Sequence, residues 1–284
     1  MAHLHSQSYG KSRVRLSHIN RAGAQHEFME VTTAIALDGD FAAAFTSADN
    51  HLVVATDTMK NTVYVLANEH GVPSIEAFGL RLAQHFLDKY PHVHTANVSL
   101  EEKPWARMQI GGHAHPHSFV AGANERNLCE ISATRTTTAM KSGLEGLQVL
   151  KTTGSGFSNF HRDEYTTLKE TDDRIFATTI EASWPCSDLR ADWTAARQQI
   201  RGAILKIFAG NFSPSVQATL FEMAEAAFAA CSLINEITIT MPNQHHLPFN
   251  MQPFGKTNAN VTFIPTDEPH GLISGTVRRG EAKS

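Results

Sequence analysis

The amino-acid sequence predicts an α+β fold in which antiparallel sheet carries paired helices on one face. Three observations predict it. Short segments alternate between apolar and polar residues, longer segments repeat apolar residues at helical spacing, and the two halves of the 284-residue chain show the same order of elements. That order is strand, strand, helix, helix, strand, strand, which is typical of α+β proteins. It predicts two domains, at residues 1–139 and 140–284.

The first half contains one clear helix and several strand-like runs. The helix spans residues 74–90, with Pro73 before it and Pro91 ending it. Its apolar side chains recur at helical spacing: Ile75, Phe78, Leu82 and Phe86. Another helix is expected to begin near Thr58, where Asp57 could act as a cap. Strands are expected at residues 11–18, 28–37, 94–100 and 118–121.

The second half repeats this plan with a pair of helices. The first carries an apolar stripe from Trp193 to Ile207 and the second from Val216 to Cys231. Ser213 and Pro214 precede the second helix, and we expect the Ser213 hydroxyl to cap it. Strands are expected at residues 147–152, 175–184, 234–241, 261–264 and 272–278. A sheet of this kind leaves open edges, which favour association between chains.

Composition excludes several classes of function. The chain has 24 Lys+Arg against 28 Asp+Glu, a net charge of −4, and no basic stretch with interleaved aromatics, so nucleic-acid binding has little support. It has no apolar run of about eighteen residues, which excludes a helical membrane span. Cys129, Cys186 and Cys231 form no Cys-x-x-Cys pair, so they indicate neither a disulfide framework nor a zinc ribbon.

A set of short motifs carries the functional signal. They are Tyr9-Gly10-Lys11, Val-Ala-Thr-Asp-Thr-Met-Lys-Asn at 54–61, His-Pro-His-Ser-Phe at 115–119, the polar run 160–174, Ser-Val-Gln-Ala-Thr at 215–219 and Pro-Asn-Gln-His at 242–245. In order and spacing, over the whole chain, these motifs resemble those of urate oxidases (uricases). The resemblance implies two tandem tunnelling-fold (T-fold) domains. It also implies a homotetramer whose sheets close into a β-barrel tunnel, with active sites at subunit interfaces.

The resemblance further implies an activity. Uricases oxidise urate with dioxygen and water to 5-hydroxyisourate and hydrogen peroxide, without cofactor or metal. Deprotonated urate is electron-rich enough to reduce dioxygen, so the protein supplies orientation, desolvation and proton transfer. From the residues alone two other classes stay open, a non-catalytic purine-binding protein on the same fold and a His-dependent metalloenzyme.

Lys11, Thr56 and His245 are the expected catalytic residues. A lone lysine in a strand-like run is usually solvated, and a threonine hydroxyl is a poor acid. A partly desolvated lysine beside that hydroxyl can act as a base through it. The resemblance implies such a dyad, which His245 completes as a proton relay. It also implies that the lysine and threonine come from one subunit and the residues that grip the ring from its neighbour.

Arg174 and Gln217 are the expected recognition pair. Carbonyl and N–H groups alternate along the edge of urate, so a guanidinium fork matches it bidentately and a side-chain amide offers both a donor and an acceptor. The resemblance makes Phe157 the ring that stacks on the purine. Taken alone, Gln217 would be a solvated helix residue and Phe157 a loop aromatic on the core.

Further residues line the expected substrate pocket by the same resemblance. They are Thr56, Asp57, Leu168, Val216 and Asn243. Asp57 and Val216 are expected to present backbone N–H groups, and Asn243 to face the position of dioxygen or water above the ring. Leu168 and Val216 could otherwise be core residues. Asn243 could belong to a turn after the strand that is expected to end at Met241.

Histidines are the main feature that points to a metal. His113, His115 and His117 alternate and could chelate from one side of an extended segment. However, no Asp, Glu or Cys stands at a ligand-like spacing nearby, and Pro116 interrupts the strand geometry. A structural or surface role is therefore favoured, and no metal site is predicted.

The two ends of the sequence bear on the compartment. The first residues lack the apolar core of a signal peptide, and the last residues are not the Ser-Lys-Leu peroxisomal signal. Eukaryotic uricases often carry that signal. We therefore expect a bacterial, cytoplasmic protein.

Overall fold

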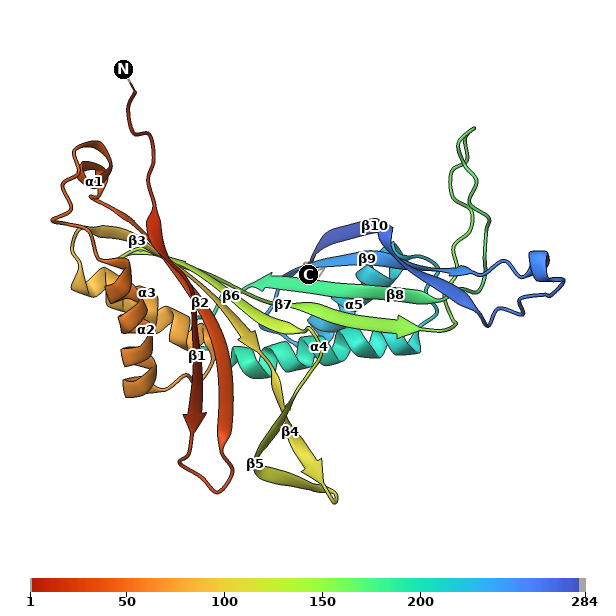
Figure 1. Ribbon diagram of the computed structural model, residues 1–284, viewed down its shortest axis with the longest axis horizontal. Coiled ribbons are helices and arrows are strands. Elements are labelled where there is room, and N and C mark those ends of the chain that lie inside the picture. Colours follow the sequence, from red (N-terminus) through yellow and green to blue (C-terminus); the bar gives the residue numbers. More distant parts are fainter. Residues whose placement is uncertain (1, 281–284) are drawn as a thin grey trace. The chain divides into compact units, whose positions relative to one another are not determined.

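The computed structural model describes residues 2–280, which fold into two compact units (Figure 1). Unit 1 contains the chain up to Leu144 together with Pro185–Thr194, and unit 2 contains Glu145–Trp184 together with the residues from Ala195 onward. Antiparallel strands with helices make up each unit, so the predicted α+β class is confirmed. The domain boundary at 139/140 stays a prediction, and the tail at 281–284 lies outside the described residues.

Unit 1 is built on strands that pair in the order β1-β2-β3-β6, all antiparallel. Its elements are β1 (Tyr9–Asn20), β2 (Glu27–Gly39), α1 (Ala42–Thr46), α2 (Thr56–His70), α3 (Ile75–Lys89), β3 (Val93–Lys103), β4 (Trp105–Ile110), β5 (His113–Ala121) and β6 (Arg126–Ala133). Helix α2 packs on β1, and α3 packs on β3 and β6. Strands β4 and β5 form a separate hairpin (Figure 1). The strand expected at 118–121 therefore belongs to this hairpin, and the fourth strand of the sheet is β6.

Helix α3 confirms the clearest prediction from the sequence. The Ser74 hydroxyl caps it by accepting a hydrogen bond from the Ala77 N–H at 3.1 Å. Phe78, Leu82 and Phe86, which recur at helical spacing, are 0% exposed. These side chains form the core between α3 and the sheet, and burying each stabilises the fold by about 1.5–3 kcal/mol.

Unit 2 has strands in the order β7-β8-β9-β10. Its elements, with β7 and α4 starting in unit 1, are β7 (Thr138–Lys151), β8 (Phe176–Pro185), α4 (Trp193–Gly210), α5 (Val216–Ala230), β9 (Glu236–Pro248), a 3₁₀ turn (Gln252–Phe254) and β10 (Phe263–Arg278). The two strands expected at 261–264 and 272–278 are one strand, because pairing with β9 resumes after an irregularity between Thr266 and Gly271. The polar residues at this irregularity interrupt the apolar alternation without ending the strand.

The strand order of the described chain leaves an open edge at β1 in unit 1 and another at β10 in unit 2. Strands β1 and β10 each pair with one neighbour, β2 and β9 respectively. Such edges are available for pairing with another chain. Among residues 2–280, no helix combines the length and apolar character that crossing a membrane requires. The three cysteines are buried.

Candidate functional site

Lys11 lies on the helix-covered face of β1 because of a β-bulge. In the register of β1 against β2, Lys11 faces Ile35. The next pair is Val14 with Thr33, so β1 holds one extra residue between the two pairs. Paired residues share a face, and Ile35 and Thr33 are both buried. Without the extra residue, Lys11 and Val14 would face opposite sides of the sheet.

The N-terminal end of α2 is held against β1 by Tyr9. The Tyr9 hydroxyl donates to the Val54 carbonyl oxygen at 3.1 Å and accepts from the Val54 N–H at 2.8 Å. Burial raises the pKa of Tyr9. Further along, the Tyr64 hydroxyl donates to the Arg15 carbonyl oxygen at 3.0 Å, so α2 runs along β1 in the same direction. Lys11 lies between these two contacts, near the first turn of α2.

Thr56 and Asp57 form the start of α2, which begins two residues before the expected Thr58. The carboxylate of Asp57 accepts hydrogen bonds from Lys60 Nζ at 2.5 Å and Asn61 Nδ2 at 2.9 Å. It makes no cap to the backbone, so its expected capping role is wrong. The hydrogen bond from Lys60 lowers the pKa of Asp57 most, and the charge of Lys11 lowers it further. Lys11 is therefore within electrostatic reach of this turn. We call Lys11, Thr56 and Asp57 the relay half.

Arg174 presents a half-buried guanidinium just before β8. Its backbone N–H donates to the Ser155 carbonyl oxygen at 2.8 Å, and its Nε donates to Ser155 Oγ at 3.4 Å. The guanidinium carbon lies 5.4 Å from the centroid of the Phe157 ring. Burial lowers the pKa of Arg174, and no carboxylate within residues 2–280 forms an ion pair with it. A desolvated guanidinium without a counter-ion is suited to binding a planar anion.

Phe157 is fixed at the base of the loop that follows β7. Its N–H donates to the Thr171 carbonyl oxygen at 2.7 Å, and the Thr171 N–H donates back to the Phe157 carbonyl oxygen at 3.1 Å. Its ring stacks on Phe160, with centroids 5.0 Å apart and an interplanar angle of 7°. Leu168 lies in the same loop and is 55% exposed, so it is not a core residue of this chain.

Helix α5 begins at Val216 and is capped by Ser215. The Ser215 hydroxyl accepts from the Ala218 N–H at 3.1 Å. The prediction that Ser213 caps this helix is therefore wrong, because the helix begins at Val216, directly after Ser215, and not at Pro214. Val216 is 3% exposed, and Gln217 is exposed in the first turn. The first N–H groups of a helix have no partner within it, so this turn can donate to an anion.

The first turn of α5 lies toward the polar end of β9. The C-terminal part of α5 is beside the end of β10, where Arg279 Nη2 donates to the Phe228 carbonyl oxygen at 2.7 Å. Earlier in β10, a Cβ at Gly275 would lie 3.1 Å from Leu220. The helix therefore runs antiparallel to β9, and its start points toward the β10 residue that pairs with Asn243.

Asn243 and His245 lie within β9, and the turn expected after Met241 is wrong. The apolar alternation stops at Met241, but pairing with β10 continues to Pro248. Asn243 and His245 occupy the same row as Met241 and are half-buried. Burial lowers the pKa of His245 most, and the charge of Arg174 lowers it further. The lowered pKa favours the neutral imidazole, and the guanidinium is close enough for its charge to contribute.

The structure thus gathers the expected residues into two groups. The relay half belongs to unit 1. The other group lies at one end of unit 2 and forms what we call the clamp half: Phe157, Arg174, Val216, Gln217, Asn243 and His245. Each half contains the start of a helix, whose positive dipole end favours a negative charge nearby.

The histidines around the β4–β5 hairpin lie close together. The rings of His115 and His117 are 4.7 Å apart, and those of His26 and His117 are 6.1 Å apart. Arg107 Nη1 of β4 donates to the His115 carbonyl oxygen of β5 at 2.9 Å, so this arginine helps to hold the hairpin together. In the part of the chain that the structure describes, no group of three or more His, Cys, Asp or Glu side chains could hold a metal ion.

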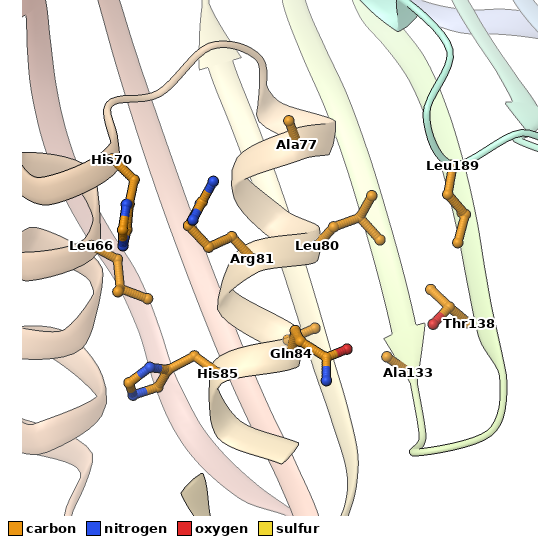
Figure 2. A pocket seen from close by; sticks show the side chains of 11 residues that line it. Leu66, His70, Ala77, Leu80, Arg81, Gln84, His85, Ala133, Thr138 and Leu189 are labelled. Atoms are coloured by element: carbon orange, nitrogen blue, oxygen red, sulfur yellow. The ribbon is translucent and has the colours of Figure 1, made fainter. Parts of the chain in front are cut away.

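A surface pocket of about 560 Å³ lies elsewhere in unit 1 (Figure 2). Figure 2 shows His70 of α2 near side chains of α3, among them Arg81 and His85. None of the residues expected from the sequence motifs lines this pocket. The pocket is therefore separate from the relay half.

Comparison with known proteins shows the family. The uricase family model matches residues 7–132 and 140–274. The chain belongs to the uricase family. It is 40% identical over 271 residues to the uricase of Arthrobacter globiformis, covering 95% of this chain and 88% of that one. It is 39% identical over 299 residues to the uricase of Aspergillus flavus, covering 97% of each. The crystal structure of Arthrobacter globiformis uricase superposes with a TM-score of 0.91 at 39% identity, covering 100% of this chain and 97% of that chain.

The two segments matched by the uricase model correspond to the two halves of the site. Residues 7–132 contain the relay half, and residues 140–274 contain the clamp half. The structure gives contacts to two residues to which the motifs alone assign no role. Tyr9, which stands in a motif, bonds both backbone groups of Val54. Lys151, which ends β7 outside every motif, donates to Ser213 Oγ at 2.8 Å, and nothing in the sequence distinguishes it from a solvated lysine.

Proposed function

We propose that this chain is a urate oxidase that converts urate, dioxygen and water to 5-hydroxyisourate and hydrogen peroxide without metal or organic cofactor. Membership of the uricase family supports the activity. The observation that carries the proposal is the half-buried Arg174 guanidinium, which has no ion-pair partner in the described chain and lies beside the Phe157 ring. His245 is close enough for the Arg174 charge to lower its pKa. These groups suit an aromatic anion.

Binding of the ring is proposed for the clamp half. The Arg174 fork donates two parallel hydrogen bonds to the urate edge, and the Gln217 amide donates to one atom and accepts from another. Phe157 stacks on the purine face. The N–H of Val216 adds a donor at the helix start. Leu168 closes the pocket from its exposed loop.

Proton transfer is proposed for Lys11, Thr56 and His245. Lys11 removes a proton through the Thr56 hydroxyl, which leaves urate electron-rich enough to reduce dioxygen. The bulge in β1 supports this role, because it turns Lys11 toward the start of α2. His245 completes the relay in its neutral form. The backbone N–H of Asp57 orients the substrate, and Asn243 faces the dioxygen or water.

A homotetramer with active sites shared between subunits is part of the same proposal. The two halves of the site lie in different units, and both edge strands are open for pairing between chains. Closing sheets into a barrel in this way removes such edges. In this arrangement the relay half of one subunit faces the clamp half of its neighbour.

Mixing two inactive variants tests the shared site. Lys11→Met disables the relay half and Arg174→Gln disables the clamp half. The two variants are unfolded and refolded together, so that mixed oligomers form. In such an oligomer, some sites combine the relay half of an Arg174→Gln chain with the clamp half of a Lys11→Met chain, and these sites contain neither substitution. We expect each variant alone to be inactive and the mixture to regain oxygen consumption with urate. A mixture as inactive as its components would contradict the shared site, and an inactive wild-type protein would contradict the proposed reaction.

A further inference from the structure

The ammonium group of Lys151 has an unusual environment at the end of β7. Its Nζ donates to the Asn211 carbonyl oxygen at 2.8 Å and to Ser213 Oγ at 2.8 Å. It also lies 5.9 Å and 5.5 Å from the ring centroids of Phe176 and Phe208. Within the described residues it forms no ion pair with a carboxylate. The nearest compensating charge is Glu222, which accepts a hydrogen bond from the Asn211 side chain at 2.8 Å and attracts the ammonium without pairing with it. Neutral acceptors and aromatic rings as the direct contacts of a lysine are uncommon, because desolvating a charge costs free energy.

The group that receives this hydrogen bond lies where two loops meet. Ser213 is 1% exposed and belongs to the connection between α4 and α5. Its backbone N–H donates to the Gly154 carbonyl oxygen at 2.9 Å, and its carbonyl oxygen accepts from the Gly156 N–H at 2.9 Å. Ser155, between those glycines, is 0% exposed. Lys151 therefore holds Ser213, and Ser213 in turn forms backbone hydrogen bonds with both Gly154 and Gly156.

This junction continues directly into the clamp half. Phe157 follows the loop by one residue, and Gln217 follows Ser213 by four. Arg174 is bonded to Ser155 twice, through its backbone N–H at 2.8 Å and its Nε at 3.4 Å. The ring, the fork and the amide that are proposed to hold urate are thus tied to one buried junction.

We propose that Lys151 is the positioning residue of the ring clamp. Its ammonium holds Ser213 in place, and through Ser213 and Ser155 it sets the relative positions of Phe157, Arg174 and Gln217. Positioning of this kind affects binding strongly, because a displacement of about 1 Å in a substrate-holding group can cost on the order of 100-fold. The inference rests on the proposed function, since it concerns the same substrate site.

The test compares Lys151→Met with Lys151→Arg and with a control on the same strand. Methionine keeps most of the length and removes the donors, whereas arginine keeps charged donors. Lys141 is exposed on β7, so Lys141→Met is the matched control. Urate affinity is measured by calorimetry without oxygen, and KM, kcat and their pH dependence are measured by oxygen consumption.

We expect Lys151→Met to weaken urate affinity and raise KM by roughly 10–100-fold, with a smaller change in kcat and an unchanged pH profile of kcat. Lys151→Arg should recover part of the affinity, and Lys141→Met should behave as wild type. If Lys151→Met fails to fold, Ser213→Ala removes only the acceptor hydroxyl and should weaken urate affinity several-fold.

Two results would overturn the inference. One is wild-type affinity and KM in a folded Lys151→Met protein whose melting temperature alone has fallen, which would make the lysine purely structural. The other is a shifted pH profile of kcat, which would make it a proton-transfer group. Because affinity is measured without oxygen, a wild-type protein that binds urate but does not oxidise it would contradict the proposed reaction while leaving this comparison intact.

Discussion

Replacing Arg174 by lysine tests the ring clamp most sharply. The guanidinium is half-buried, without an ion-pair partner in residues 2–280, and 5.4 Å from the Phe157 ring centroid. In the proposed complex it donates two charge-assisted hydrogen bonds to urate. Lysine keeps the charge but cannot reproduce the planar fork, so we expect one of these bonds to be lost.

The size of the effect follows from that loss. A hydrogen bond to a charged group contributes about 1.5–3 kcal/mol. Since roughly 1.4 kcal/mol corresponds to a factor of ten, Arg174→Lys should raise the dissociation constant of urate by about 10–150-fold. The Nε contact with Ser155 is long, at 3.4 Å, so its loss should add little.

The assay is calorimetric titration with urate in the absence of oxygen, followed by KM from oxygen consumption. Arg278→Lys is the control, because that side chain is 80% exposed and pairs with Glu236 on the surface. The control should bind as wild type. Urate affinity within threefold of wild type in Arg174→Lys would refute the bidentate clamp.

Three further predictions concern proton transfer and stability. Lys11→Met should lower kcat by roughly 10²–10⁴-fold while anaerobic urate binding persists, and full turnover would exclude the relay. In an NMR titration, the pKa of the His245 imidazole should lie below about 6.5. Arg174→Gln should raise this pKa because a repelling charge is removed. An unchanged pKa would show that the two groups do not interact. Hydrogen bonds from Arg15 and Trp105 lower the pKa of Glu30, so its carboxylate stabilises the fold above its unfolded pKa of about 4.3 and this contribution is lost as pH falls through the lowered value. Urea unfolding of Glu30→Gln should therefore show a deficit at pH 7 that shrinks in acid, whereas a pH-independent deficit would contradict the linkage.

The sequence predicts the elements best where apolar periodicity is uninterrupted. Helix α3 follows from the spacing of Phe78, Leu82 and Phe86. The errors in β9 and β10 occur where polar residues stand inside a regular element. Strand β9 continues through Asn243, because pairing with β10 continues although the apolar pattern has ended. Breaks of this kind are expected where side chains serve a site, and Asn243 belongs to the candidate site.

The motifs name the residues of the candidate site but do not give its geometry. The motifs name Lys11 and Thr56. However, strict alternation of side chains along β1 would put Lys11 and Val14 on opposite faces of the sheet. Only the bulge corrects this, and Arg13 accommodates it with a φ of 58°, a conformation that side chains other than glycine rarely adopt. Likewise, the role of Lys151 depends on contacts with Ser213, about sixty residues away in sequence, and long-range contacts leave no local signal.

The most direct test of the cofactor-free reaction follows oxygen consumption and the ultraviolet absorbance of urate together, with purified protein before and after dialysis against EDTA. We expect equal molar loss of urate and dioxygen, formation of hydrogen peroxide, and the same rate with and without EDTA treatment. Saturable urate binding without turnover would make the protein a purine-binding protein. Turnover that EDTA abolishes would contradict the cofactor-free mechanism and would make the histidines of the β4–β5 hairpin candidates for metal ligands.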